Sequence, residues 1–170
     1  MSIDQEIHAD EPAPTSAGGV SIRSAVADDL TAAAELRWQW VQELDGEPVV
    51  DHDVFLTVFT EWAVAHTATH HCLVARRADA VIGMAWLAVV PRVPSARALE
   101  RASGDLQCVY VVPAERNAGV GARLLAAVRA RADELGLERV TVHSSADAIS
   151  AYRRAGFVVS ERLLQSTLGA

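Results

Sequence analysis

The stretch D-L-Q-C-V-Y-V-V-P-A-E-R-N-A-G-V-G-A-R-L-L, from Asp105 to Leu125, decides the fold. An apolar, β-branched run comes first, a proline ends it, and an amphipathic helical pattern begins around Gly119 and Gly121. A strand that leads through such a turn into a helix leaves the first N–H groups of the helix unpaired, at the positive end of the helix dipole. The stretch therefore predicts an anion-binding helix N-terminus.

Outward from this stretch, the hydrophobic periodicity predicts a mixed α/β sheet with the element order β-α-α-β-β-β-α-β-α-β. One domain over residues 20–170 follows an acidic, Pro- and Ser-rich segment, residues 1–19, which we expect to be a flexible tail. The expected strands are Val20–Ser24, His71–Arg76, Ala80–Val90, Asp105–Val112, Glu138–His143 and Phe157–Leu168. The expected helices run from Asp28 or Asp29 to about Leu44, over Asp51–Ala65, from the glycine turn to about Leu135 and over Asp147–Ala155, with one helical turn at Ala96–Ala102.

Composition narrows the class of protein. With 170 residues, 51% apolar and 22% charged, the chain is long enough for one domain with a core and is not of a disordered type. No apolar run approaches the 18–20 residues of a membrane span, and the N-terminus lacks the basic and apolar regions of a signal peptide, so a cytoplasmic protein without a membrane partner is expected. A net charge of −7 without a basic block argues against a nucleic-acid partner.

The lack of lysine and the surroundings of the cysteines and histidines argue against several kinds of catalytic and metal-binding site. The chain has no lysine, which removes Schiff-base chemistry and Walker-type phosphate binding. Cys72 and Cys108 lie in strand-like surroundings and are expected to be reduced core thiols. His66, His70 and His71 have no accompanying carboxylate and straddle an expected helix-to-strand break, so no metal site is predicted.

Three sequence blocks resemble the GNAT superfamily of acyl-CoA N-acyltransferases. R-N-A-G-V-G at Arg116–Gly121 matches the family's Arg/Gln-x-x-Gly-x-Gly/Ala signature, and L-Q-C-V-Y-V-V-P before it resembles the family's fourth strand. A-I-S-A-Y-R-R-A-G-F at Ala148–Phe157 resembles the Ala-x-x-x-Tyr-x-x-x-Gly-Phe block. The resemblance covers about Val20–Leu168. It implies a mostly antiparallel sheet with splayed central strands and helices on both faces, and an acetyl-CoA-dependent enzyme without a metal that transfers acetyl directly to a primary amine of a small molecule or protein.

The resemblance also implies how acetyl-CoA is held. The pyrophosphate would contact Arg116 and the backbone of the glycine turn, and the pantetheine arm would pair with the strand before it. The amide of Val109 or Tyr110 would polarise the thioester carbonyl. Ser145 stands where the family often has Asn. The cofactor-binding residues expected in this way are Val109, Tyr110, Val111, Arg116, Asn117, Ala118, Gly119, Val120, Gly121, Ala122 and Ser145.

Two residues are candidates for acid–base catalysis. Tyr152 matches the family tyrosine that protonates the leaving thiolate, although a tyrosine here can also simply pack against the strand. Asp105 stands where many family members have a glutamate that deprotonates the amine through water. A second interpretation, that Asp105 is an ordinary carboxylate at the end of a strand, has equal weight. Glu43, Glu61 and His143 are weaker alternatives for the base.

Other residues receive structural readings. A covalent intermediate on Cys108 is not expected, because direct attack by an amine needs no enzyme nucleophile. The tryptophans are expected mainly in the core rather than in a cage for a cationic acceptor. The acidic loop Leu44–Asp53 lies where the family's acceptor side would be, and either selects a cationic amine or is merely solvated.

Two alternatives remain at this level. The same fold could serve as a catalytically silent acyl-CoA-binding or interaction module. A nucleotide-binding α/β protein is a poorer reading, because the turn lacks the first glycine of G-x-G-x-x-G. The resemblance also allows a homodimer.

Overall fold

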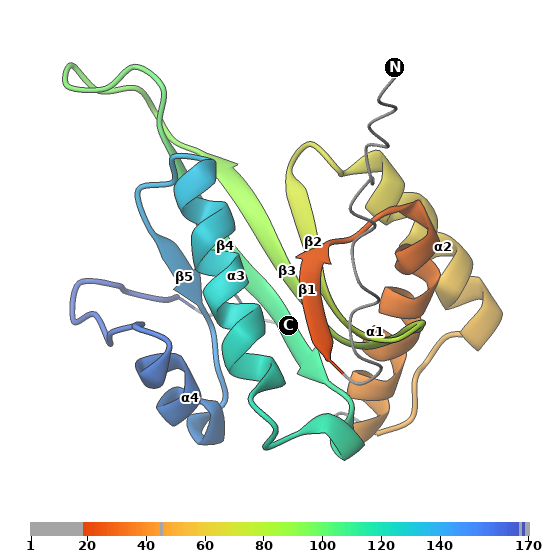
Figure 1. The fold of residues 1–170 in the computed structure, drawn as a ribbon. Coiled ribbons are helices and arrows are strands. Elements are labelled where there is room, and N and C mark those ends of the chain that lie inside the picture. Colours follow the sequence, from red (N-terminus) through yellow and green to blue (C-terminus); the bar gives the residue numbers. More distant parts are fainter. Residues whose placement is uncertain (1–18, 45, 167, 169–170) are drawn as a thin grey trace, which may run out of the picture.

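The computed structural model describes residues 19–44, 46–166 and 168, and these form a five-stranded sheet with the strand order β1-β2-β3-β4-β5 (Figure 1). The expected tail over 1–19 lies outside the described residues except for Gly19. Short 3₁₀ turns precede α1, α3 and α4 at Ala27–Asp29, Pro113–Glu115 and Ala146–Ala148. The main elements are β1 (Val20–Ser24), α1 (Leu30–Leu44), α2 (His52–Ala65), β2 (His70–Arg77), β3 (Ala80–Pro91), β4 (Ala102–Val111), α3 (Val120–Glu134), β5 (Val140–Val142) and α4 (Ile149–Arg154).

The sheet separates two apolar cores. Strands β1 to β4 are antiparallel to their neighbours, and β5 runs parallel to β4. One core lies between the sheet and α3, with α4 at its margin, and the other lies between the sheet and the pair α1 and α2. Figure 1 shows this three-layer arrangement, with α3 and α4 on the near face. The predicted fold class, an α/β sheet covered on both faces, is confirmed.

Most elements begin and end where the periodicity and capping signals place them. The Asp51 side chain accepts hydrogen bonds from the N–H groups of Asp53 and Val54 at 2.9 and 3.2 Å and so begins α2. Gly136, with φ of +65°, follows the end of α3. None of the helices in the described part of the chain is long and apolar enough to cross a bilayer.

The connection before β4 was predicted wrongly. The helical turn expected at Ala96–Ala102 is absent, and β4 already begins at Ala102 instead of Asp105. Gly104 looked like a loop residue, but it is buried within the strand. A Cβ at Gly104 would lie 2.8 Å from a methyl carbon of Leu87, so close packing explains this glycine.

The last expected strand is also absent. From 157 to 166, and at 168, the structure contains no strand, although the sequence predicts strand character over Phe157–Leu168. After Phe157, its apolar side chains are open to solvent, with Val158 86% and Leu164 91% exposed. β propensity alone does not form a strand, because the stabilising contacts come from a neighbouring strand and a packed face.

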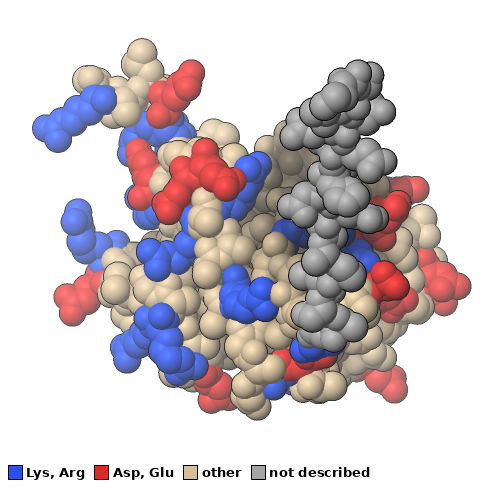
Figure 2. Space-filling model, in the orientation of Figure 1, with Lys and Arg blue, Asp and Glu red and all other residues tan. Residues whose placement is uncertain are grey.

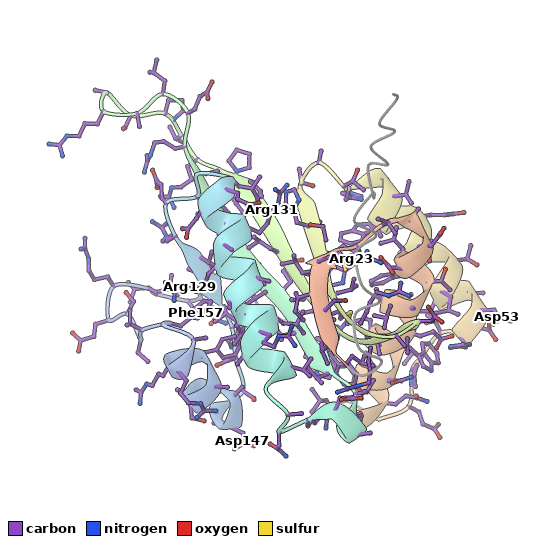
Figure 3. All side chains as sticks on the ribbon, viewed as in Figure 1. Arg23, Asp53, Arg129, Arg131, Asp147 and Phe157 are labelled. Atoms are coloured by element: carbon purple, nitrogen blue, oxygen red, sulfur yellow. The ribbon has the colours of Figure 1, made fainter. Side chains whose placement is uncertain are left out.

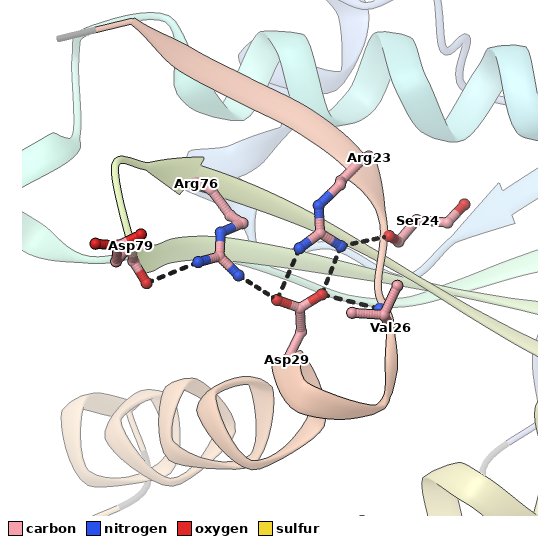
Figure 4. Close-up of polar contacts among 6 residues, drawn as sticks. All are labelled: Arg23, Ser24, Val26, Asp29, Arg76 and Asp79. Carbon is pink, nitrogen blue, oxygen red and sulfur yellow. Dashed lines mark hydrogen bonds and ion pairs between the residues drawn. The ribbon is translucent and has the colours of Figure 1, made fainter. Parts of the chain in front are cut away.

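A buried carboxylate fixes the start of α1 to the sheet (Figure 4). Asp29 is fully buried, and its two oxygens accept hydrogen bonds from Arg23 at 2.6 and 3.0 Å and from Arg76 at 2.6 Å. The backbone N–H of Val26 donates to the same carboxylate at 2.8 Å. Burial alone would raise the pKa of Asp29, but these hydrogen bonds outweigh it and hold the pKa below its usual value. Asp29 therefore joins β1, β2 and α1.

Candidate active site

A β-bulge in β4 decides which side chains face which helices. Trp86 of β3 pairs with Cys108 and the next residue, Leu87, pairs with Leu106, so Gln107 is the extra residue. Leu106 packs in the core beneath α3, whereas Cys108 packs in the core beneath α1 and α2. The bulge thus turns Cys108 toward α1 and α2, and Val109 follows on the α3 side.

Beyond the bulge, β4 leaves its neighbour. β5 pairs with β4 only from Gly104 to Leu106, and the rest of β4 has no partner strand on that side within the described chain. The Val112 N–H donates to the Ile82 carbonyl on β3. Since backbone groups alternate along a strand, the N–H of Val109 faces the side from which β5 has diverged. The expected splay is therefore present, and it exposes a stretch of strand edge.

The turn after β4 presents a row of backbone donors. Asn117 and Gly119 have positive φ values, 64° and 80°, and Gly119 is the N-cap of α3. Within the described residues, the N–H groups from 117 to 122 have no backbone acceptor outside regular helix bonding, and the first helical bond runs from Arg123 N to Gly119 O at 3.1 Å. Nothing lies within 4 Å of a Cβ built at Gly121. This open, donor-rich helix N-terminus suits a phosphate group.

Arg116 is held by α1 and β4. Its Nε donates to the Val111 carbonyl at 2.9 Å, and Nη2 donates to the carboxylate of Glu43 at 2.6 Å. The hydroxyl of Tyr110 donates to the other Glu43 oxygen at 2.5 Å. Burial first, and then the Glu43 carboxylate, raise the pKa of Tyr110 to about 12. The side chain of Tyr110 therefore lies under α1, and by the alternation along β4 its backbone groups face β3 and not the opened edge, so its predicted cofactor contact stays a prediction.

Tyr152 lies on the α3 side of the sheet. It packs at the margin of the core beneath α3, half-buried, with its ring 5.4 Å from that of Phe157 in an edge-to-face arrangement. Burial, with a smaller contribution from the Cys108 thiol, raises the pKa of Tyr152. The phenol is thus a protonated group near the unpaired part of β4, as a general acid requires.

The segment that carries Tyr152 is fastened to α3. Arg129 Nη1 donates to the Ala155 carbonyl at 2.8 Å, and Arg129 lies beside Phe157 in Figure 3. Gly156 has φ of +87°, and a Cβ there would collide with the Arg129 guanidinium. The Gly-Phe pair of the sequence block is therefore a docking turn against α3.

Asp105 lies on the opposite face from Tyr152. Its neighbour Leu106 packs beneath α3, so Asp105 points toward α2, where its charge counteracts the lowering of the His70 pKa by burial. Within the described residues, the Asp105 carboxylate accepts a 3.3 Å hydrogen bond from Gln107 Nε2 and has no ion pair. The candidate acid and base thus flank the unpaired stretch of β4 from two sides of the sheet.

The other base candidates are placed less favourably. Glu61 and His143 are exposed. Hydrogen bonds from Tyr110 and Arg116 occupy both oxygens of Glu43 and lower its pKa, which makes it a poorer base. Ser145 is exposed and precedes a 3₁₀ turn without capping it through its side chain, so its predicted cofactor contact stays a prediction.

Aromatic side chains on the α1 and α2 side form a packed cluster. Trp86 is 4% exposed, with the rings of Phe59 and Trp62 at 5.5 and 5.7 Å from its own. Trp38 packs on Phe55. The reading of these residues as packing groups agrees with this arrangement. Trp40 instead lies beneath a cation of the protein itself. The sequence did not predict this contact.

That cation is Arg37, whose guanidinium carbon lies 4.2 Å from the Trp40 ring centroid. Its position on the same helical side as Leu30, Ala33 and Ala34 is the only sequence signal for its orientation toward the sheet.

No group of three His, Cys, Asp or Glu side chains able to hold a metal ion occurs in the described ranges. On the face that Figure 2 shows, acidic and basic side chains are interspersed.

Comparisons with known proteins now identify the family. The chain belongs to the acetyltransferase (GNAT) family, whose model matches residues 31–157. It is therefore a GNAT N-acetyltransferase, and the family's fold uses acetyl-CoA. A search of curated proteins found no match.

Solved structures share the fold at low sequence identity. A predicted acetyltransferase with acetyl-CoA from Clostridium acetobutylicum is 19% identical, with a TM-score of 0.71 over 88% of this chain and 96% of that chain. A GCN5-related N-acetyltransferase from Ralstonia eutropha is 20% identical, with a TM-score of 0.68 over 89% and 100%. An aminoglycoside acetyltransferase from an uncultured soil sample, in complex with trehalose, is 17% identical, with a TM-score of 0.68 over 89% and 96%. At these identities the likeness supports the fold alone.

Proposed function

We propose that the chain binds acetyl-CoA along β4 and the turn before α3 and transfers the acetyl group directly to a primary amine. The observation that carries this proposal is the continuity of two features: the unpaired edge of β4 beyond Leu106 leads straight into the free N–H groups of residues 117–122. An extended pantetheine arm fits a free strand edge, and a pyrophosphate fits the helix N-terminus behind it.

The cofactor contacts follow from this placement. Backbone N–H groups of Asn117, Ala118, Gly119, Val120, Gly121 and Ala122 would hold the pyrophosphate. Val109 and Val111 present their backbone toward the opened side of β4, and the Val109 N–H is the donor for the thioester carbonyl. Arg116 adds positive charge beside the turn, although Glu43 already neutralises part of it. Tyr110 and Ser145 contribute at most peripheral contacts.

The reaction balances with two protein groups. The amine nitrogen forms a bond to the thioester carbonyl carbon, and it loses its proton through water to Asp105. The bond from the carbonyl carbon to sulfur breaks, and the leaving thiolate takes the phenolic proton of Tyr152. Because Tyr152 and Asp105 flank β4 from opposite faces, one can protonate sulfur while the other receives the amine's proton.

Replacing Tyr152 with Phe tests this assignment, because only the hydroxyl is removed and the ring contact with Phe157 is kept. Turnover of acetyl-CoA with an amine should fall about 100-fold or more, while acetyl-CoA binding measured by calorimetry should stay unchanged. Phe157→Leu is the matched packing control. Unaltered turnover in Tyr152→Phe would refute the role of the phenol, and tight acetyl-CoA binding without transfer to any amine would instead favour the silent binding module.

A further inference from the structure

Arg37 is a cation on the acceptor side of the sheet for which the described part of the chain supplies no acidic partner. It lies on the sheet-facing side of α1, partly buried, with its guanidinium stacked on Trp40. Trp40, the ring on which the guanidinium is stacked, packs in the same core as Cys108, the first residue after the bulge. The positive charge of Arg37 accordingly opposes the rise that burial causes in the pKa of the Cys108 thiol. The cation therefore approaches β4 where the thioester is proposed to bind.

The other partly buried arginines of the described chain all have acidic partners. Arg37 is the exception: within the described residues no hydrogen bond or ion pair is found for its side chain, and the remaining arginines without such contacts are exposed. Removing a guanidinium from water without an opposite charge is unfavourable, and an aromatic ring compensates only part of that cost. The paired arginines are Arg23, Arg76, Arg77, Arg92, Arg101 and Arg131.

The same side of β4 also has a carboxylate, Asp105, that forms no ion pair within the described residues. Asp105 lies three residues before Cys108, and both side chains face α1 and α2 because of the bulge at Gln107. A site between α1 and β4 would thus offer one positive and one negative side chain, on either side of the place where the amine must attack.

We propose that the acceptor is a small amino carboxylic acid, whose carboxylate binds Arg37 while its amino group faces Asp105 and the thioester. This inference rests on the proposed function and specifies its acceptor. A planar carboxylate fits the edge of a guanidinium whose face is covered by Trp40, through two parallel hydrogen bonds. A phosphate, with nearly twice the charge, would be repelled more strongly by Asp105.

Matched acceptor pairs test the proposal with the full chain. Free amino acids, both α- and ω-, are compared with their carboxamides, which keep the amine and the shape but lose the negative charge. We expect kcat/KM to be about 10- to 100-fold higher for the acids, the range of a charge-assisted hydrogen-bond pair. At neutral pH a larger fraction of the less basic carboxamide amine is unprotonated, so the supply of free amine favours the carboxamides and runs against the expected result.

Variants of Arg37 assign the preference to this residue. Arg37→Gln should abolish the preference for acids and raise KM for them, whereas Arg37→Lys should retain part of it. Arg97→Gln, at an exposed loop arginine, should change neither. Calorimetric binding of the acids to the complex with CoA, and thermal unfolding of each variant, separate loss of recognition from loss of folding.

The outcomes distinguish the two levels of the proposal. Equal or faster acetylation of the carboxamides by the wild-type chain, or an unchanged acid preference in Arg37→Gln, would overturn the assignment of Arg37 while leaving the acetyltransferase function standing. Absence of transfer to every amine would instead refute the proposed function itself.

Discussion

Replacing Asp29 with Asn should destabilise the fold strongly. The carboxylate is fully buried and is bonded to Arg23, Arg76 and the N–H of Val26. An amide keeps the size of the side chain but removes its negative charge, and one of its two oxygen positions becomes a donor facing a guanidinium. Both arginines would then lack a buried counter-charge.

The size of this effect follows from what is known of buried ion pairs. Breaking one by removing a single partner costs about 3–5 kcal/mol. For a domain of this size, each kcal/mol lowers Tm by about 2–4 °C. Thermal unfolding followed by circular dichroism should therefore show Asp29→Asn melting roughly 6–20 °C below the wild-type chain. Asp28→Asn, at the exposed neighbouring position, should melt close to the wild type.

The pH dependence gives a second readout of the same contact. Folding lowers the pKa of Asp29 below its usual 3.8, so its ion pairs contribute stability above that value, and the contribution is lost as pH falls through the lowered folded-state pKa. The stability advantage of the wild-type chain over Asp29→Asn should accordingly be full near neutrality and disappear in strong acid. A difference in Tm below about 2 °C at neutral pH, less than 1 kcal/mol for a domain of this size, would refute this reasoning.

Two further substitutions probe the site. Glu43→Gln should lower the pKa of Tyr110 from about 12, because the carboxylate that disfavours the phenolate is gone, and ultraviolet titration of tyrosinate should record the shift; an unchanged titration would contradict the contact. Gly156→Ala should destabilise the chain by more than Gly136→Ala, because both add strain of about 1–2 kcal/mol at positive φ but only at Gly156 must the Arg129 guanidinium move aside and give up its hydrogen bond to the Ala155 carbonyl. Equal denaturant midpoints would contradict that account.

Local patterns were sufficient to predict much of the fold. The helices α1, α2 and α3 and the hairpin of β2 and β3 have the expected apolar periodicity, and their observed bounds differ from the prediction by one or two residues. The signature turn was also found from sequence, and its Gly119 has a positive φ that most other residues avoid.

Features that depend on contacts between distant residues could not be predicted in this way. Gly104 was taken for a loop residue because its packing against Leu87 leaves no local signal. The alternation of Leu106, Gln107 and Cys108 is that of a regular strand, so nothing in the sequence indicates the bulge at Gln107 or the orientation of Cys108 toward α1. The contact of Tyr110 with Glu43 joins residues 67 positions apart. Conversely, local β propensity predicted a last strand that has no neighbouring strand in the described chain.

The fate of the acetyl group tests the central claim most directly. Acetyl-CoA labelled in the acetyl carbons is mixed with the chain and a panel of amino acids, amines and peptides, and the label is traced in a single turnover. The account predicts that the label moves to an amine as an amide while CoA thiol is released in equal amount, with none retained on the protein. Label held covalently by the protein, on Cys108 or elsewhere, or tightly bound acetyl-CoA that transfers to no amine, would contradict direct acetyl transfer.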